Sequence, residues 1–247
     1  MKLLSLNCNK FAGRKSDGKG EHFQADILDE IAESVKQFLN EASDNLVLLH
    51  EVNYRRAFFS HFTAAFSDHD TTLHLPTYIT QINRNGKRIR PYGCTLAITK
   101  KTSAWEQDES LDLNQQHDYA NKSIIMRNKE LSVIGVHMPY DLPFWELLNS
   151  YYRQHSKKAL VIVGDLNVYD QGTDRKEKLE QLLQAGAIDV WTESKKAFDH
   201  PTCNTGRRID YALMSAPAYE RFGAIQLQDS YRDDGLSDHS ALIVDIK

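Results

Sequence analysis

Gly164-Asp165-Leu166-Asn167 directly follows a run of five aliphatic residues, Ala159 to Val163, and places a carboxylate and a carboxamide where that run ends. Such a run is typical of a strand that is buried on both faces. If the extended backbone continues, Asp165 and Asn167 point to the same side, because side chains alternate along a strand. A carboxylate beside an amide donor can hold a water or a phosphate oxygen. Gly, Asp and Asn also suit a simple turn, so other residues must decide between the two interpretations.

Other polar residues stand at the ends of apolar segments in the same way. They are Asn7, Asn9, Glu51, His137, Asp210, Asp238 and His239. Asp210 lies inside the apolar segment Arg208 to Leu213, and it needs a partner because an isolated buried carboxylate is costly. Each residue taken singly also fits a cap, a turn or a satisfied core position. As a group, these carboxylates, carboxamides and histidines favour a pocket for a hard divalent cation and a phosphate.

The elements that position these residues alternate between strands and helices, which predicts one α/β domain over residues 1–247. The expected strands are Lys2 to Leu6, Leu46 to Leu49, Thr95 to Thr99, Leu131 to His137, Ala159 to Val163, Ile209 to Met214, Ile225 to Gln228 and Ala241 to Ile246. The expected helices are Ala25 to Asn40, one carrying Phe58, Phe62 and Phe66 on a buried face, Pro143 to His155, and Arg175 to Ala185. No internal repeat or linker interrupts this order.

Composition is that of a globular protein, with 41% hydrophobic and 26% charged residues. The net charge of -4 neither supports nor excludes a nucleic-acid partner, because local basic patches can still bind a polyanion. Cys8, Cys94 and Cys203 are odd in number and widely spaced, which argues against a disulfide framework and a thiolate zinc site. With no signal-peptide pattern and no run of membrane-spanning length, we expect a cytoplasmic protein.

The ordered set of motifs resembles the endonuclease/exonuclease/phosphatase superfamily, which includes DNase I and the exonuclease III-like AP endonucleases. The matching motifs are Leu6-Asn7, His50-Glu51, His137-Met138-Pro139, Gly164-Asp165-Leu166-Asn167, Arg208-Ile209-Asp210-Tyr211 and Ser237-Asp238-His239. They run nearly from end to end of the chain and in family order. The resemblance implies a four-layer α/β/β/α sandwich, in which two mixed sheets are flanked by helices and the active site lies at one edge.

The resemblance also implies a metal site. Glu51 would be the main Mg²⁺ ligand, and Asn7 and Asp238 would complete or share the site. Oxygen ligands without thiolates favour Mg²⁺, with Mn²⁺ as the alternative, over Zn²⁺.

The remaining motif residues would carry out the chemistry. By resemblance, Asp165 would orient and deprotonate the attacking water, and Asn167 would help it and donate to a phosphate oxygen. His239, held by Asp210, would bind or protonate the phosphoryl group, and His137 would contact the phosphate from the other side. Phosphodiester hydrolysis needs such groups, because charge builds on the nonbridging oxygens during attack.

Four positions depart from the family pattern. Leu6 replaces a Trp that often precedes the Asn, and His50 replaces the usual Gln before Glu51. Asn9 and His137 stand where AP endonucleases carry an Asp and a Tyr. The chain is therefore more similar to the DNase I, sphingomyelinase and deadenylase branches, and an AP endonuclease is disfavoured.

The segment Arg84 to Arg90 places four basic residues, Arg84, Lys87, Arg88 and Arg90, in seven positions and is expected in a hairpin turn or exposed loop. With Tyr78, Tyr92 and Arg207-Arg208 nearby, it would suit a nucleic-acid backbone. A solvated hairpin tip, or a site for phosphoinositide headgroups, fits the same charges.

The favoured function is a Mg²⁺-dependent phosphodiesterase, most simply a nuclease that acts on DNA or RNA. A phosphomonoesterase or a phosphoinositide or phospholipid-headgroup hydrolase is the enzymatic alternative. The remaining hypothesis is a noncatalytic binding protein that retains the fold. The joint presence of Asp165, Asn167, Asp210 and His239 argues against it.

Overall fold

The computed structural model of the chain describes residues 1–14, 23–54, 56–67, 70–76, 81–82, 88–89, 93–108, 121–168, 173–197 and 199–247. Two six-stranded mixed sheets form its centre. The first has the strand order β13-β14-β1-β2-β6-β3. In that order the strands are Phe222–Gln228, Ala241–Ile246, Lys2–Asn7, Leu46–Val52, Cys94–Lys100 and Thr71–His74.

The second sheet has the order β11-β12-β10-β9-β8-β7. Its strands, in that order, are Ile188–Asp189, Asp210–Met214, Leu160–Asp165, Ser132–His137, Ser123–Arg127 and Glu106–Gln107. Each sheet contains one parallel pair, β1 with β2 and β10 with β9, and its other pairings are antiparallel. A separate antiparallel pair joins β4 (Gln81–Ile82) to β5 (Arg88–Ile89).

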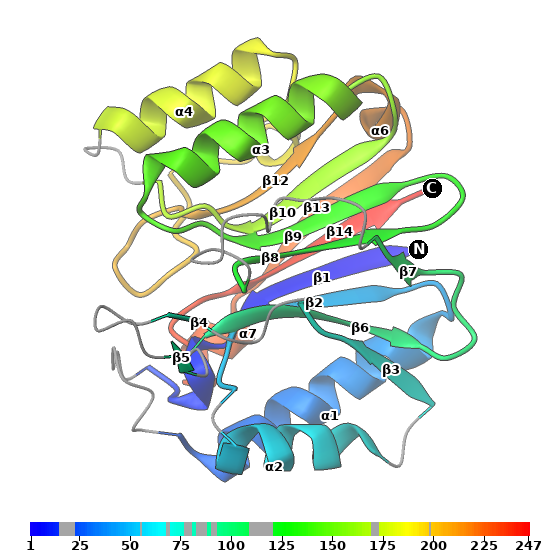
Figure 1. Cartoon of the computed structure of the whole chain (residues 1–247), viewed down its shortest axis with the longest axis vertical. Coiled ribbons are helices and arrows are strands. Elements are labelled where there is room, and N and C mark those ends of the chain that lie inside the picture. The colour runs from blue at the N-terminus through cyan, green and yellow to red at the C-terminus, as the bar shows by residue number, and fades with distance from the viewer. Residues whose placement is uncertain are drawn as a thin grey trace.

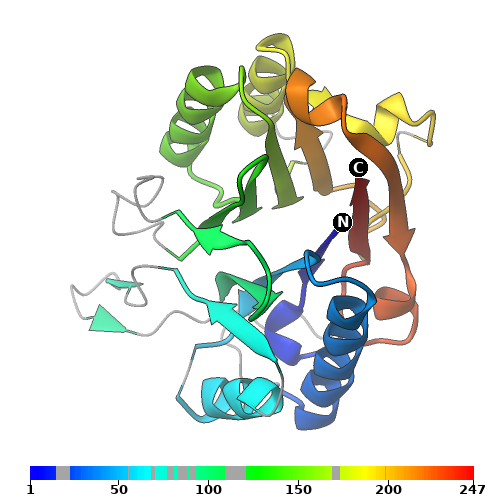
Figure 2. The same ribbon diagram turned by 90° about the vertical axis from the view of Figure 1, so that its right-hand side faces the viewer.

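Helices cover the outer faces of both sheets, as Figures 1 and 2 show. α1 (Ala25–Glu41) and α2 (Arg56–Ser67) lie on the first sheet, and α3 (Leu142–His155) and α4 (Thr173–Gln184) lie on the second. Short helices complete the described chain: η1 (Asn9–Phe11), α5 (Val190–Glu193), α6 (Ala216–Tyr219) and α7 (Ser230–Asp233). The predicted α/β/β/α sandwich is confirmed.

Three hydrophobic clusters correspond to the three interfaces between these layers. One joins α1 and α2 to the first sheet, and another joins α3 and α4 to the second. The third lies between the sheets, where Leu48 of β2 packs against β9 at Gly135. A Cβ atom on Gly135 would come within 2.7 Å of the Leu48 Cδ2 atom, so a glycine at this position permits the close approach of the two sheets.

Most predicted elements agree with the structure to within two residues at their starts, including the helix that buries Phe62 and Phe66. α4 begins at Thr173 rather than Arg175, and β12 begins at Asp210 rather than Ile209. The sequence reading missed β3, β7, β8 and β11, which are short or only partly apolar. Within the described part of the chain, no helix has the length and hydrophobicity required to cross a membrane.

Candidate active site

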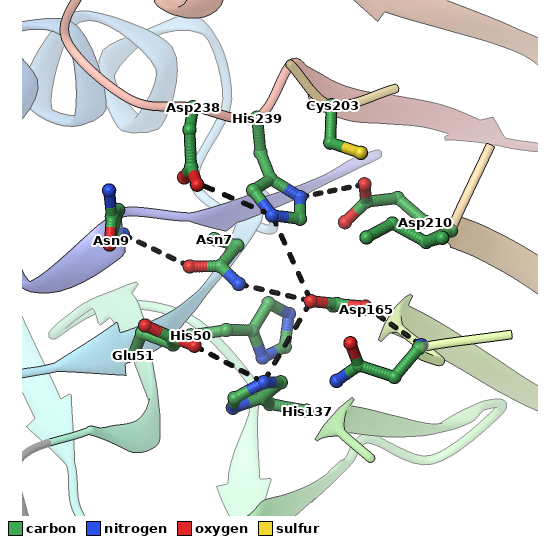
Figure 3. Close-up of polar contacts among 12 residues, drawn as sticks. Asn7, Asn9, His50, Glu51, His137, Asp165, Cys203, Asp210, Asp238 and His239 are labelled. Atoms are coloured by element: carbon green, nitrogen blue, oxygen red, sulfur yellow. Dashed lines mark hydrogen bonds and ion pairs between the residues drawn. The ribbon is translucent and has the colours of Figure 1, made fainter. Parts of the chain in front are cut away.

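The candidate active site lies where the carboxyl ends of the two parallel strand pairs meet. Asn7 is level with His50 in the β1–β2 pair, and Asp165 is level with His137 in the β10–β9 pair. Asp165 is also level with Asp210 across the antiparallel β10–β12 pair. Because the two sheets pack face to face, these side chains gather at one edge of the sandwich (Figure 3).

Two hydrogen bonds fix the side chain of Asp165, the last residue of β10. The backbone N–H of Asn167 donates to Asp165 Oδ1 at 2.8 Å, and the Asn7 amide donates to Asp165 Oδ2 at 3.1 Å. Gly164 precedes it with a φ of 143°, and a Cβ there would lie 2.0 Å from the Val136 carbonyl oxygen, so only glycine fits.

Of the two interpretations left open by the sequence, the extended backbone does not continue through Asn167, which has a φ of 52° in the left-handed region. The segment is thus a turn and also part of the pocket, and the two interpretations of its sequence are not exclusive. Asn167 Nδ2 donates to the Met138 carbonyl at 2.9 Å, which uses one of the two amide hydrogens and leaves the other for a ligand.

The partner that burial demands of Asp210 is the imidazole of His239. His239 Nδ1 lies 2.9 Å from Asp210 Oδ2, and both side chains are buried. Burial alone would lower the pKa of His239, but the adjacent Asp210, together with Asp165 and Asp238, raises it well above the ordinary value. His239 is therefore a cationic ring at neutral pH, with Nδ1 held by Asp210.

The other ring nitrogen of His239 faces two carboxylates across gaps. Nε2 lies 3.9 Å from Asp165 Oδ2 and 3.9 Å from Asp238 Oδ1, both too long for a direct hydrogen bond (Figure 3). Burial raises the pKa of Asp165 to about 7, although the charge of His239 opposes this shift. A carboxylate whose pKa lies near neutrality is suited to act as a general base.

Glu51 and His137 form the opposite wall of the pocket. His137 Nε2 lies 3.3 Å from Glu51 Oε1 and 3.8 Å from Asp165 Oδ2. Burial raises the pKa of Glu51, but the positive charge around it, to which the Lys10 and Lys122 ammonium groups contribute, outweighs burial and lowers it to about 2. Burial and the nearby Lys122 ammonium lower the pKa of His137 well below its ordinary value, so this ring is neutral.

Lys10 is a site residue that the sequence reading missed. Its ammonium group donates a hydrogen bond to Glu51 Oε2, and it reaches that carboxylate from a turn in which Asn9, Lys10 and Phe11 all have positive φ. Glu51 itself has a φ of 54° within β2. Positive φ is unfavourable for residues with a Cβ, and such strain is characteristic of functional sites. A sequence pattern carries no signal for this turn.

His50, which precedes Glu51, has a structural role behind the pocket. Its ring is fully buried between Ser5 Oγ at 2.9 Å and Thr95 Oγ1 at 3.1 Å. Burial lowers the pKa of His50 to about 4, so the ring is neutral. It joins β1, β2 and β6 directly beneath the predicted metal ligand.

The pocket bounded by these side chains has a volume of about 280 Å³. Its lining contains all of the predicted chemical residues except Asp210, which lies behind His239. Sequence reading also missed Tyr140, Asn204 and Thr205 at the pocket wall. The last two lie in the loop before β12, where the Asn204 N–H donates to the Asp238 carbonyl at 2.8 Å.

The residues present fit a divalent cation in two ways. Among the described residues, the ligand atoms of Asp165, Asp210 and His239 lie within 4.8 Å of one another, but Asp210 and His239 are already bonded together. The predicted set is the better fit, because the buried Asp238 Oδ1 accepts no hydrogen bond within the described chain. Glu51 already attracts a cation, the ammonium of Lys10.

The basic segment is not placed at this pocket. Arg84, Lys87 and Arg90 lie outside the described residues, as do Tyr78 and Tyr92. Of this region the structure describes the antiparallel pairing of β4 with β5, in which Ile82 lies opposite Arg88.

In the second basic pair, Arg207-Arg208, the two side chains differ in environment, because Arg207 is exposed and Arg208 is not. Arg208 is buried, and its guanidinium bonds both oxygens of Asp189 at 2.7 and 2.6 Å. It therefore belongs to the core.

Comparison with known proteins agrees with this architecture. Neither a protein-family model nor a curated protein matches the sequence. The structure of an AP endonuclease from Archaeoglobus fulgidus is similar, with a TM-score of 0.70 and 17% identity over 100% of this chain and 99% of the other. A 3'-5' exonuclease, NExo, from Neisseria meningitidis has a TM-score of 0.69 and 16% identity over 100% of both chains. An endonuclease/exonuclease/phosphatase family protein from Leptotrichia buccalis has a TM-score of 0.62 and 14% identity over 100% of this chain and 99% of that one.

The chain thus has the DNase I-like fold of the endonuclease/exonuclease/phosphatase superfamily, as the sequence resemblance predicted. At these identities, structural similarity establishes the fold. The reaction must be inferred from the chemistry of the pocket.

Proposed function

We propose that this protein is a divalent-metal-dependent phosphodiester hydrolase that acts on nucleic acid. One observation carries the proposal: a buried, cationic His239 is held by Asp210 and faces Asp165, whose pKa is raised to about 7. A noncatalytic binding protein has no need to bury two carboxylates beside one imidazole, because such burial costs stability. The similar structures of an exonuclease and an AP endonuclease support the same class of reaction.

In this mechanism Asp165 accepts the proton of the attacking water. Asn7 and the Asn167 N–H hold its carboxylate in one orientation, so that its proton-accepting edge faces the pocket. His239 donates from Nε2 to a nonbridging oxygen of the phosphate and neutralises part of the charge that develops there. Nε2 lies 3.9 Å from each of the two carboxylates, so its N–H is bonded to neither and can donate to that oxygen.

The neutral His137 and the second amide hydrogen of Asn167 contact the phosphate from the other wall. Glu51, Asn7 and Asp238 would hold the cation, for which Mg²⁺ or Mn²⁺ suits an all-oxygen ligand set. A divalent ion bound there supplies positive charge against the phosphate oxygens.

A substrate panel tests the proposal. Duplex DNA, single-stranded DNA, RNA, abasic duplex, a phosphomonoester and inositol phosphates are each incubated with Mg²⁺, Mn²⁺ or chelator. We expect hydrolysis of at least one nucleic acid that the chelator abolishes, and thermal stabilisation of the protein by the active ion. Hydrolysis of inositol phosphates alone would move the protein to the headgroup-hydrolase alternative. Binding without hydrolysis of any substrate would contradict the enzyme assignment.

Asp165→Ala and His239→Ala should each lower kcat by about 10²- to 10⁴-fold, the range for a general base or acid. The matched control is His61→Ala, which removes an exposed histidine that pairs with Asp29. This variant should retain full activity. Circular dichroism and the melting temperature would show that the inactive variants remain folded.

A further inference from the structure

Tyr140 lies at the wall of the candidate active site and is unusually exposed for an aromatic residue. Of the Tyr140 surface, 63% is accessible to solvent. Within the described residues, Leu183 is the only other large apolar side chain that is exposed, at 37%. Tyr140 follows the motif His137-Met138-Pro139 in the connection between β9 and α3.

The segment that carries Tyr140 is tied to the proposed catalytic residues. The Met138 N–H donates to the Asp165 carbonyl at 2.8 Å, and the Met138 carbonyl accepts from Asn167 Nδ2 at 2.9 Å. α3 begins at Leu142, two residues after Tyr140. The backbone of Tyr140 is therefore anchored beside the proposed catalytic residues, because hydrogen bonds hold Met138 before it and α3 begins just after it.

Arg175, in the first turn of α4, supports the ring from one side. Its guanidinium carbon lies 4.4 Å from the centroid of the Tyr140 ring, which is a cation–π arrangement. Most of the Tyr140 surface remains accessible despite this contact. A flat aromatic ring with a cation behind it is well suited to stack on another flat, electron-rich ring.

The size of the pocket indicates what would lie against Tyr140. Its volume of about 280 Å³ is just below the range of about 300–1,000 Å³ for pockets that enclose drug-sized ligands. Polar side chains form most of its lining. This lining suits a phosphate better than a base, so the base attached to the adjoining sugar would lie against Tyr140 at the pocket wall.

We propose that Tyr140, supported by Arg175, is a stacking platform for an unpaired base next to the cleaved phosphate. The inference rests on the proposed function and narrows it to single-stranded or locally unpaired nucleic acid. Bases within a duplex already stack on their neighbours, whereas unpaired bases bind aromatic side chains. A lipid surface is disfavoured, because insertion into a membrane uses a cluster of apolar side chains and Tyr140 stands among polar ones.

The first experiment compares Tyr140→Leu, which removes the ring, with Tyr140→Phe, which restores it. The substrates are a short single-stranded oligonucleotide and the same oligonucleotide with abasic sugars on both sides of the cleaved phosphate. For the oligonucleotide with bases, Tyr140→Leu should lower kcat/KM about tenfold, since the stacking of a base on the ring is lost. Tyr140→Phe should recover most of that loss. On the abasic oligonucleotide, Tyr140→Leu should lower kcat/KM by less than twofold. Leu183→Ala is the control for an exposed apolar side chain outside the pocket.

A second readout does not depend on turnover. An oligonucleotide that contains 2-aminopurine should lose fluorescence on binding in chelator, and Tyr140→Leu should abolish that quenching. Suppose that the wild type cleaves nucleic acid and that Tyr140→Leu lowers kcat/KM equally for both oligonucleotides, or for neither. The stacking role of Tyr140 is then wrong, and the proposed function stands. If the wild type cleaves only inositol phosphates, the proposed function fails and the platform fails with it. Sedimentation with phosphatidylserine vesicles that depends on the Tyr140 ring would assign the ring to a lipid surface and overturn the inference.

Discussion

The two histidines of the pocket carry opposite protonation states although both are buried. Burial favours the neutral form of each ring. His137 is neutral, because the Lys122 ammonium lowers its pKa further. His239 is protonated, because Asp210 accepts a hydrogen bond from its Nδ1 and raises the pKa of the ring. One residue type thus supplies a neutral contact on one wall and a cation on the other, and the neighbouring charge decides which.

Asp165→Asn should reveal the stability that the fold gives up at this position. Burial raises the pKa of Asp165 from 3.8 to about 7. The folded state therefore binds the proton more tightly than the unfolded state, and the stability from this group is lost as pH rises from 3.8 through 7. Asp165→Asn has no group that ionises at this position, so its stability does not fall in this way as pH rises. Relative to wild type, it should gain about 2 kcal/mol in unfolding free energy between pH 5 and pH 8, measured by urea denaturation without metal. A gain on acidification instead would contradict the raised pKa.

Lys10→Met should strengthen divalent-ion binding. The Lys10 ammonium bonds the carboxylate of Glu51, where the cation is proposed to bind, and Met keeps the length of the side chain without the charge. We expect Mn²⁺ to bind several-fold more tightly by calorimetry, because one competing cation is removed. Lys36→Met, which removes a lysine paired with Glu33 on α1, should leave the affinity unchanged. Weaker binding would mean that Lys10 supports the ion rather than competing with it.

Residue types alone predicted most of this pocket, because a carboxylate or carboxamide at a strand end has few other uses. The contact between Lys10 and Glu51 could not be predicted from residue types. It depends on three successive residues, Asn9 to Phe11, with positive φ, and none of them is a glycine that would mark a left-handed turn. Glu51 is similar: its identity was predictable, and its left-handed backbone was not.

Among the elements, most long buried strands were predictable, whereas the edge strands β3, β7 and β11 and the interior strand β8 were not. β10 has six fully buried residues and reads as a continuous apolar segment, so its position follows from hydrophobicity. β3 is only half-buried along its length, and β7 has two residues. Edge strands such as these bury one face or none, so their sequences carry little pattern and their pairing depends on the neighbouring strand.

Gly135→Ala tests the close approach of the two sheets. The added methyl group would lie 2.7 Å from Leu48 Cδ2, and Leu48 is fully buried between the sheets. We expect a loss of about 1–3 kcal/mol in unfolding free energy, because the core cannot relax to accept it. Adding Leu48→Val to Gly135→Ala should recover part of the loss, whereas Leu48→Val alone should destabilise the protein. Additive losses in the double variant would show that the two positions do not compete for space.

At the scale of the whole molecule, charge must be arranged locally for a polyanion to bind. The net charge is -4, so the proposed association with nucleic acid would rely on local basic patches, for which Arg84 to Arg90 is the candidate in the sequence, rather than on the average field. The composition could not predict where such a patch lies relative to the pocket. Of that segment the structure describes only Arg88 and Ile89, in the β4–β5 pair.

Replacing Arg84, Lys87, Arg88 and Arg90 with Ser should weaken nucleic-acid binding at low salt. The slope of log Kd against log salt should fall by about 1 to 3, because fewer counterions are released when fewer phosphates are neutralised. Fluorescence anisotropy with a labelled oligonucleotide measures both quantities. Four matched substitutions on α4 and its surroundings, at Lys176, Lys178, Lys195 and Lys196, control for the change in net charge. An unchanged slope would place the binding surface elsewhere.

The position of β14 couples folding to activity. This strand pairs with β13 on one side and β1 on the other, and Asp238 and His239 lie just before it. Asp165 belongs to the other sheet and can meet His239 only when both sheets are complete and docked. A partly folded chain would lack the proposed acid–base pair even with all its residues present. If the proposed function holds, the recovery of activity on refolding would therefore report the joining of the two sheets.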